Sequence, residues 1–315
     1  MRGNESILTL ERLVSEGSDS ASSSHWNAYH AEFSSQGQGA RLGGLRGFGS
    51  LTKRSTVRRA AHRVMLTPYR RFIPDRQAFA VNLRLLREIA RRQDRALDLD
   101  MYRQALTLTH ISQRVPTSRE SDSFWAVIGD GFGVLAALIL LRYPNSRVAL
   151  FNLDRTLLVD LVFLRHVFGE EFDRTASLVR SGNELQGALT GSNDRMPRLL
   201  AFRAQDQHFL GDLPVDVVTN VVSMQEMRSA DINGYFGQMR RVASERQVHF
   251  YCCNRDEKEL PDGSVIRFVD YPWSADDTVL TDEACPWHQN YYSLRPPSYR
   301  RYDGPHRHRL IRVAP

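Results

Sequence analysis

The chain has 315 residues, of which 42% are hydrophobic and 25% charged, and it contains only three cysteines. These values exclude a disordered, collagen-like or disulfide-rich protein, and they provide enough apolar residues for a large core. The formal net charge is +6, and all but two of the 42 cationic side chains are arginines. The longest apolar run, at 134–141, is far shorter than the roughly 20 residues of a membrane-spanning helix. The N-terminus has no apolar stretch typical of a signal peptide, so we expect a cytoplasmic protein.

The positive charge is concentrated in the first part of the chain. Residues 1–120 contain 20 Lys and Arg against 11 Asp and Glu, whereas residues 121–315 contain 22 against 25. A basic region of this kind is found in proteins that bind nucleic acid, and it is also typical of a solvated, arginine-rich helical surface. No nucleic-acid-binding motif accompanies the charge, so nucleic acid is not the partner that we expect.

Two regions precede the part of the chain that carries the motifs. Residues 1–50 include runs of Ser, Gly and Gln, which bury too little apolar surface to offset the entropy of ordering, so we predict a mobile or poorly packed segment. Residues 51–118 form a basic helical region, in which Leu83, Leu86 and Ile89 recur at helical spacing.

From residue 119 onwards the sequence alternates apolar strands with helices. Strands are predicted at 124–128, 147–153, 198–203, 215–222 and 247–253, and helices at 134–141, 156–168 and 230–244. This alternation is typical of an α/β protein with a mostly parallel sheet covered on both faces. Residues 265–270 and 309–313 resemble strands without a helix between them, so we expect an antiparallel pair that closes the sheet.

A glycine-rich motif, Ile128-Gly129-Asp130-Gly131-Phe132-Gly133, lies between the first strand and the first helix of this region. Glycines let the backbone turn tightly and approach a ligand, and the N-terminus of a helix follows. A dinucleotide-binding motif has glycine at its sixth position, where this chain has Val134. The spacing instead resembles the motif of S-adenosylmethionine-dependent methyltransferases, which makes Ile128, Gly129, Asp130, Gly131 and Gly133 candidates for cofactor binding. A glycine-rich turn without a ligand is the alternative.

Polar residues follow the second and third predicted strands. Asn152 and Asp154 are candidates for binding ribose hydroxyls, and Asp206 and Gln207 for binding an adenine edge. Because ligands bind at the carboxyl edge of such a sheet, these side chains would flank the glycine-rich motif. Each of them is equally compatible with a helix cap or a turn.

The candidate acceptor side begins after the fourth predicted strand, where Glu226 stands in the segment Ser-Met-Gln-Glu-Met. A carboxylate there would point toward the ligand, although it also suits the start of a helix. Residues 270–305 are rich in Pro-Trp pairs and tyrosines, whose flat faces suit the stacking of a sugar ring or packing onto a core. The candidates for substrate binding there are Trp273, Trp287, Tyr291, Arg300 and Arg301.

Taken together, these segments resemble the sugar O-methyltransferase family of bacteria over about residues 120–315. The resemblance rests on the glycine-rich motif at 128–133, Ser-Met-Gln-Glu-Met at 223–227, Leu-Pro-Asp-Gly at 260–263, Asp-Tyr-Pro-Trp at 270–273, the Pro-Trp-His segment at 286–288, and Arg-Arg-Tyr-Asp-Gly-Pro at 300–305. It implies a Rossmann-like methyltransferase fold over residues 119–315, with a mostly parallel seven-stranded sheet whose last strand is antiparallel. It also implies S-adenosylmethionine as methyl donor and a hydroxyl of a sugar or glycosylated small molecule as acceptor.

One position departs from the methyltransferase pattern. The superfamily usually carries an acidic residue two positions before the first glycine, and this chain has Val127 there. Asp130, inside the glycine-rich motif, is the nearest substitute. Because of this departure, a non-catalytic protein of the same fold remains an alternative. Because of the basic helices, a methyltransferase that acts on nucleic acid is a second alternative.

Methyl transfer to a hydroxyl requires alignment of the reacting atoms and removal of a proton. A neutral imidazole suits the base, and His288 is the only histidine inside the aromatic acceptor segment, so it is our first candidate. Glu226 and Asp270 are the alternatives, as bases, as groups that orient His288, or as ligands of a divalent metal ion. His306 and His308 are expected at the surface. A homo-oligomer is compatible with the sequence.

Overall fold

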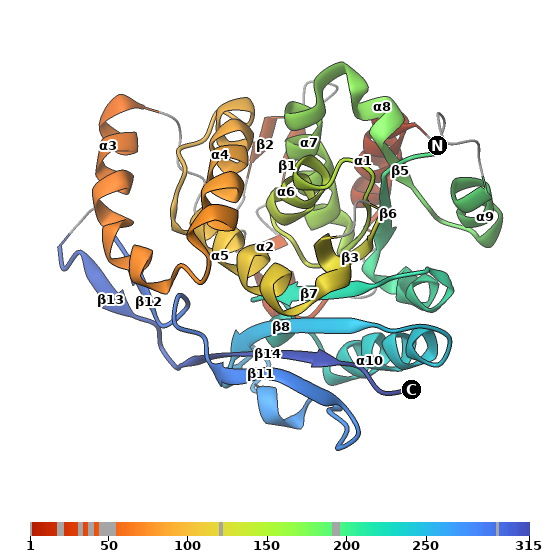
Figure 1. The fold of residues 1–315 in the computed structure, drawn as a ribbon. Coiled ribbons are helices and arrows are strands. Elements are labelled where there is room, and N and C mark those ends of the chain that lie inside the picture. Colours follow the sequence, from red (N-terminus) through yellow and green to blue (C-terminus); the bar gives the residue numbers. More distant parts are fainter. Residues whose placement is uncertain are drawn as a thin grey trace.

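The computed structural model describes residues 2–17, 22–30, 34–36, 41–43, 55–119, 122–190, 196–293 and 296–315. Its centre is a sheet of eight strands with helices on both faces (Figure 1). In order across the sheet these are β11 (Thr278–Ala284), β14 (His306–Arg312), β8 (His249–Arg255), β7 (Val217–Val221), β3 (Phe124–Ile128), β4 (Arg147–Asn152), β6 (Leu199–Arg203) and β5 (Ala176–Leu178).

The strand order identifies the fold. The chain runs from β3 outward through β4 to β6, and then returns to the other side of β3 for β7 and β8, with all these pairings parallel. The last strand, β14, lies between β8 and β11 and is antiparallel to both. This is the Rossmann-like methyltransferase fold that we expected, with the short strand β5 added as an eighth strand beside β6.

Apolar side chains of the central strands supply two cores, one on each face of the sheet. Along β3, Trp125 and Val127 belong to one core, while Phe124, Ala126 and Ile128 belong to the other. Strands buried on both faces have nearly continuous apolar sequences, and this is why β3, β4 and β7 could be predicted.

Helices cover both faces of the sheet. The first core includes residues of α4 (Arg76–Arg92), α5 (Leu99–Arg114), α6 (Val134–Arg142), α7 (Asp154–Phe168) and α8 (Phe172–Thr175), and the second includes residues of α9 (Gly182–Thr190), α10 (Ser229–Ala243) and the 3₁₀ helix η6 (Ala204–Asp212). The helices predicted at 134–141, 156–168 and 230–244 are confirmed as α6, α7 and α10. Over the described parts of the chain, no helix has both the length and the apolar character needed to cross a membrane.

The basic helical region predicted at 51–118 is packed onto the sheet. It consists of α3 (Thr56–Met65), the 3₁₀ helix η2 (Thr67–Phe72), α4, α5 and the 3₁₀ helix η3 (Pro116–Arg119). Leu86 of α4 and Leu106 of α5 share one core with the strands, so these helices belong to the same folded unit. Asp75 and Asp98 begin α4 and α5, because each carboxylate accepts a hydrogen bond from the backbone N–H three residues later.

The N-terminal segment contains a packed helix that its composition did not indicate. In α1 (Gly3–Glu16), Ile7 and Leu10 are buried in the first core, and the Ser6 hydroxyl accepts a hydrogen bond from the N–H of Leu178 at 2.9 Å. Residues 1–50 were predicted to be mobile or poorly packed, but α1 at the start of this segment packs onto the first core. The segment continues through α2 (Ser24–His30), β1 (Ser34–Gln36) and β2 (Arg41–Gly43), and its remaining parts, including much of the Ser/Gly run, lie outside the described residues.

The antiparallel pair at the end of the sheet has a different partner from the one predicted. The strand predicted at 309–313 is β14, but it pairs with β11, and residues 265–267 form β10, in a separate hairpin with β9 (Glu257–Glu259). All but one residue of β11 are exposed, so the strand lacks an apolar pattern that would reveal it. A second hairpin joins β12 (Asn290–Tyr292) to β13 (Tyr299–Arg301).

Candidate functional site

The glycine-rich motif forms a tight turn between β3 and α6. Gly129, Gly131 and Gly133 have φ angles of 70°, 70° and 60°, a region that favours glycine. A Cβ atom on Gly129 would lie 2.0 Å from Ser223 Oγ, and one on Gly133 would lie 2.5 Å from Leu164 Cγ. Both glycines therefore permit close packing, whereas a Cβ atom on Gly131 would meet nothing within 4 Å among the described residues, because Gly131 borders a cavity.

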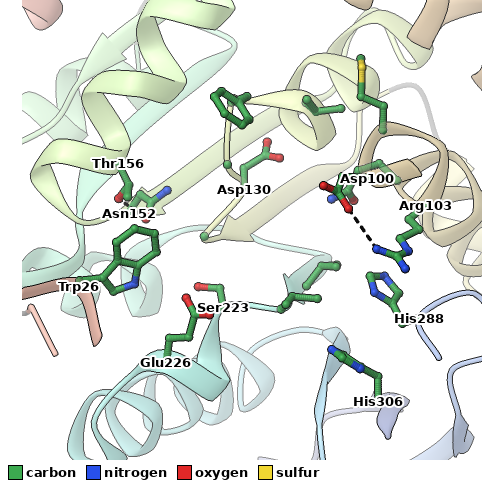
Figure 2. Close-up of a pocket in the computed structure, with 18 of the residues that line it drawn as sticks. Trp26, Asp100, Arg103, Asp130, Asn152, Thr156, Ser223, Glu226, His288 and His306 are labelled. Carbon is green, nitrogen blue, oxygen red and sulfur yellow. Dashed lines mark hydrogen bonds and ion pairs between the residues drawn. The ribbon is translucent and has the colours of Figure 1, made fainter. Parts of the chain in front are cut away.

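This cavity, which we call the main cavity, has a volume of about 260 Å³ and lies at the carboxyl ends of β3, β4 and β7 (Figure 2). Ligands of open α/β sheets bind at this edge, where the chain leaves neighbouring strands in opposite directions. The lining residues are Trp26, Arg95, Asp100, Met101, Arg103, Gln104, Gly129, Asp130, Gly131, Phe132, Val134, Asn152, Thr156, Val221, Val222, Ser223, Glu226, His288, Tyr302 and His306.

A smaller cavity adjoins the main cavity, and we call it the side cavity. Both are lined by Trp26, Asn152, Ser223 and Glu226, so these four side chains form the boundary between them. The side cavity extends toward Phe151, Leu153, Ala204 and Tyr235, over the ends of β4 and β6.

Of the two polar residues predicted at the end of β4, only Asn152 lies in the site. Its side-chain N–H donates to Asp160 Oδ2 at 2.8 Å, and its Oδ1 accepts from Thr156 Oγ1 at 2.6 Å. Asp154 is buried outside both cavities, where its carboxylate receives two hydrogen bonds from the guanidinium of Arg203 at 2.6 and 2.7 Å. Asp154 thus fixes the start of α7, and Asn152 is the one of the two candidates that lines the cavities.

Asp130 lines the main cavity, but its carboxylate is already used within the turn. Its oxygens accept hydrogen bonds from the N–H groups of Leu135 and Ala136 at 2.9 and 2.7 Å, so Asp130 caps α6. Burial raises the pKa of Asp130 to about 7. The pKa of Asp160 is raised as well, by burial and then by the neighbouring Asp130 carboxylate. Asp130 is therefore not a substitute for the acidic residue that Val127 replaces.

Glu226 lies between a lysine and a histidine at the boundary of the cavities. Its carboxylate is 2.5 Å from Lys258 Nζ and 3.3 Å from His25 Nε2. Burial opposes the charge on Glu226, but the His25 hydrogen bond and the Lys258 charge outweigh it and hold the pKa below its usual value. Each oxygen of this carboxylate already has a side-chain partner, whereas a general base needs a free site, so Glu226 fits the acceptance of a ligand hydrogen bond better than proton abstraction.

His288 lies on the opposite side of the main cavity, close to Arg103 and His306 (Figure 2). His288 is buried, and its Nε2 has no hydrogen-bond partner among the described residues. Burial, followed by the charge of Arg103, lowers its pKa well below the usual value, so the imidazole is neutral. His306 shares these properties, with an unpartnered Nδ1 and a pKa lowered to about 3 mainly by burial. The expectation that His306 and His308 lie at the surface is wrong. Both are buried on β14, which lies between β8 and β11 in the sheet.

Arg103 of α5 connects the acceptor segment to the helical region. Its guanidinium donates to the backbone oxygen of Trp287 at 2.8 Å, to that of Asn290 at 2.6 Å and to the hydroxyl of Tyr302 at 2.9 Å. It also pairs with Asp100 at 3.1 Å, and the Asp100 side chain is half exposed at the cavity wall. Arg103 thereby holds the segment that carries His288 against the cavity.

Several predicted site residues lie elsewhere. Those outside both cavities are Ile128, Gly133, Asp154, Asp206, Gln207, Asp270, Trp273, Trp287, Tyr291, Arg300 and Arg301. Trp273 packs against Phe236 and Phe250 in the second core, and Trp287 is buried against His110 and His308. The side chains of Asp270, Arg300 and Arg301 are exposed. The aromatic segment is therefore largely core, and His288 and Tyr302 are the parts of it that reach the main cavity.

Asp206 and Gln207, which we predicted to bind an adenine edge, do not line either cavity. Both lie in η6 outside the cavities, and burial raises the pKa of Asp206. Ala204, at the end of β6, lines the side cavity instead.

His288 also belongs to a group of three residues that could hold a metal ion. Atoms of Cys253, Cys285 and His288 that could ligate a metal lie within 4.8 Å of one another, and all three residues are buried. Burial raises the pKa of Cys285 well above its usual value, so this thiol is neutral. Cys253 comes from β8 and the other two from the segment after β11, so their distance in the sequence concealed this group.

Sequence reasoning missed the residues that reach the site from the N-terminal helices. These are Trp26 of α2, Arg95, and Asp100, Met101, Arg103 and Gln104 of α5. Asp98 caps the start of α5, but the local sequence does not indicate which side chains of this helix face the edge of the sheet.

No protein-family model matches the sequence, and no curated protein is similar to it. Solved structures with a similar arrangement include PhzM, a pyocyanin biosynthetic protein, with 14% identity over 68% of this chain and 58% of that one and a TM-score of 0.33. They also include TrmK of M. capricolum in complex with S-adenosyl-homocysteine, with 10% identity over 66% of this chain and 67% of that one and a TM-score of 0.37. The chain thus spans less than two thirds of the length of PhzM. The fold assignment rests on the strand order.

Proposed function

We propose that this chain is an S-adenosylmethionine-dependent O-methyltransferase that acts on a hydroxyl of a sugar or glycosylated small molecule. The observation that carries the proposal is one cavity, at the switch point of a methyltransferase-type sheet, that joins the glycine-rich turn to a buried neutral histidine with a free ring nitrogen.

The donor side is supported by residues that remain open to a ligand. Gly131 leaves space for a ligand in the glycine-rich turn, because a Cβ atom there would meet nothing within 4 Å among the described residues. Asn152 and Glu226 are placed to bind ribose hydroxyls, and Trp26 lies at the boundary of the two cavities, where its ring can cover the nucleoside. S-adenosylmethionine would supply an activated methyl group there. S-adenosyl-homocysteine is the ligand of the similar TrmK structure.

The acceptor side is supported by the polar groups around His288. His288 is neutral and able to take a proton, and Arg103 and Tyr302 offer donors at the cavity wall. Asp100, with half of its side chain exposed, is placed to accept from an acceptor hydroxyl. A wall with both donors and acceptors suits a molecule with several hydroxyls, and this supports the sugar acceptor that the resemblance implies.

Isothermal titration of the full chain with S-adenosylmethionine, S-adenosyl-homocysteine and NAD tests the donor half of the proposal. We expect binding of the first two and none of NAD. Binding of NAD alone, or of none of the three, would contradict it. If the donor binds and no methylated product forms with a panel of sugars and glycosides while a structured RNA is methylated, the acceptor half is wrong.

A further inference from the structure

A separate cavity lies on the helical side of the molecule, between α3, η2 and α4. It has a volume of about 470 Å³, within the range of sites for small molecules. Six arginines border it, namely Arg59, Arg63, Arg70, Arg87, Arg91 and Arg95, and we call it the arginine cavity. These are six of the 14 arginines at 51–118.

Helical spacing directs the arginines to the same space. Arg59 and Arg63 are one turn apart on α3, and so are Arg87 and Arg91 on α4. Figure 1 shows α3 and α4 as neighbouring helices at one end of the molecule.

The arginines have few anionic partners of their own. No Asp or Glu is among the residues that line the arginine cavity. Among the described residues, Glu88 forms ion pairs with Arg91 and Arg92, and Asp98 forms one with Arg95. The side chains of Arg63, Arg70 and Arg87 make no hydrogen bond or ion pair with any residue in the described part of the chain. Like charges gathered in this way destabilise a fold unless an anion neutralises them.

The floor of the arginine cavity is apolar. Leu66, Phe79 and Tyr102 are buried there, and Leu83 is half-buried beside them. Burial raises the pKa of Tyr102, while the charges of Arg70 and Arg87 lower it. The positive potential of these two arginines therefore acts on a residue of the floor. A wall of one sign around low-dielectric side chains concentrates that field.

We propose that the arginine cavity binds a small amphiphilic anion, with one phosphate group at the arginine rim and an apolar chain or ring on the floor. A phosphate alone would leave the partly exposed apolar side chains of Ile73, Leu83 and Leu97 in contact with water. A nucleic acid would need aromatic faces for its bases or a long basic track, whereas Phe79 and Tyr102 are buried within the floor. Guanidinium groups suit phosphate because they donate in a planar fork.

The arginine cavity and the main cavity share one wall. Arg95 lines both; its guanidinium lies 4.2 Å from the ring centroid of Phe132, in the glycine-rich turn, and pairs with Asp98 at 3.3 Å. The proposed anion site is nevertheless independent of methyl transfer, since none of its other residues lines the main cavity.

Titration of the full chain with octyl phosphate, below the concentration at which it forms micelles, tests the proposal. We expect saturable binding of one molecule, with octyl glucoside and inorganic phosphate each binding at least about tenfold more weakly because each lacks one half of the ligand. Equal binding of inorganic phosphate, or displacement of octyl phosphate by a short single-stranded RNA, would overturn it.

Two variants assign the binding to this cavity. The double substitution R63Q/R87Q removes rim charges, and L83W fills the floor, so each is expected to weaken octyl phosphate binding by about tenfold or more. The matched control R76Q/R84Q removes two exposed charges of α4 that do not line the cavity, and it should leave the affinity within about twofold. Circular dichroism checks that each variant is folded. Unchanged binding in a folded R63Q/R87Q variant, or equal loss in the control, would refute the site.

Discussion

Asp160 of α7 holds the side chain of Asn152 and the backbone of Gly133 at the same time, because its carboxyl accepts from Asn152 Nδ2 at 2.8 Å and from Gly133 N at 3.0 Å. One buried group thus joins the end of β4, where a ribose would bind, to the glycine-rich turn. Neither hydrogen bond faces the ligand, so Asp160 positions the residues that do.

Replacement of Asp160 by alanine should loosen both attachments. It leaves two buried donors without partners, at a cost of about 1–3 kcal/mol each, so the free energy of unfolding should fall by a few kcal/mol at most. The affinity for S-adenosyl-homocysteine should fall by about tenfold, as Asn152 loses its orientation. Urea unfolding and isothermal titration measure the two effects. The exposed D276A variant is the control, and unchanged affinity in a destabilised D160A would limit Asp160 to a structural role.

Asp130 makes stability depend on pH in a direction opposite to that of most carboxylates. Burial raises its pKa to about 7 in the folded chain, above the usual value of about 3.9, so the folded state holds a proton that the unfolded state releases. This contribution to stability is fully present below about pH 4 and is lost as the pH rises toward 7. Buried histidines such as His306, whose pKa is lowered to about 3, act in the opposite direction below pH 6.5.

The difference between the wild type and D130N cancels the contribution of the histidines and retains that of Asp130 and the neighbouring Asp160. We expect the wild type to lose stability relative to D130N as the pH rises from 4.5 to 7.5, with urea midpoints measured at each pH. A difference that stays constant over this range would show that Asp130 keeps an ordinary pKa.

The fold could be predicted where single strands or turns carry the signal. The apolar sequence of β3 and the spacing of Gly129 and Gly131 are local properties, and both placed the glycine-rich turn at the edge of the sheet where the main cavity lies. β11 could not be predicted, because six of its seven residues are exposed and Thr278, Asp282 and Glu283 interrupt its apolar residues.

The composition of the site depended on contacts distant in the sequence. Trp26 and Arg103 reach the main cavity from α2 and α5, and the sequence does not indicate the packing that brings them there. Trp273 and Trp287 illustrate the opposite error, because an aromatic residue suited to stacking on a sugar is equally suited to the core. His306 was misjudged because polar neighbours in β14 concealed its burial between β8 and β11.

Trp26 should contribute to donor affinity from its position at the boundary of the main and side cavities. The W26A variant removes a large apolar surface from both, so the affinity for S-adenosyl-homocysteine should fall by about tenfold, and W26F should retain most of it. Quenching of tryptophan fluorescence on titration provides a second readout, which W26F should lose in part. If W26A binds like the wild type, α2 does not contact the ligand.

His288 carries the most direct test of the proposed reaction. H288A should lower the rate of methyl transfer by about a hundredfold or more, as expected for loss of a general base, while the affinity for S-adenosyl-homocysteine stays within about twofold. H208A is the matched control, since His208 is exposed and outside both cavities. The rate is measured as S-adenosyl-homocysteine released with a sugar acceptor that the wild type methylates. Loss of donor affinity in H288A would place His288 on the donor side. An unchanged rate would instead transfer the role of base to His306, the other neutral imidazole of the main cavity.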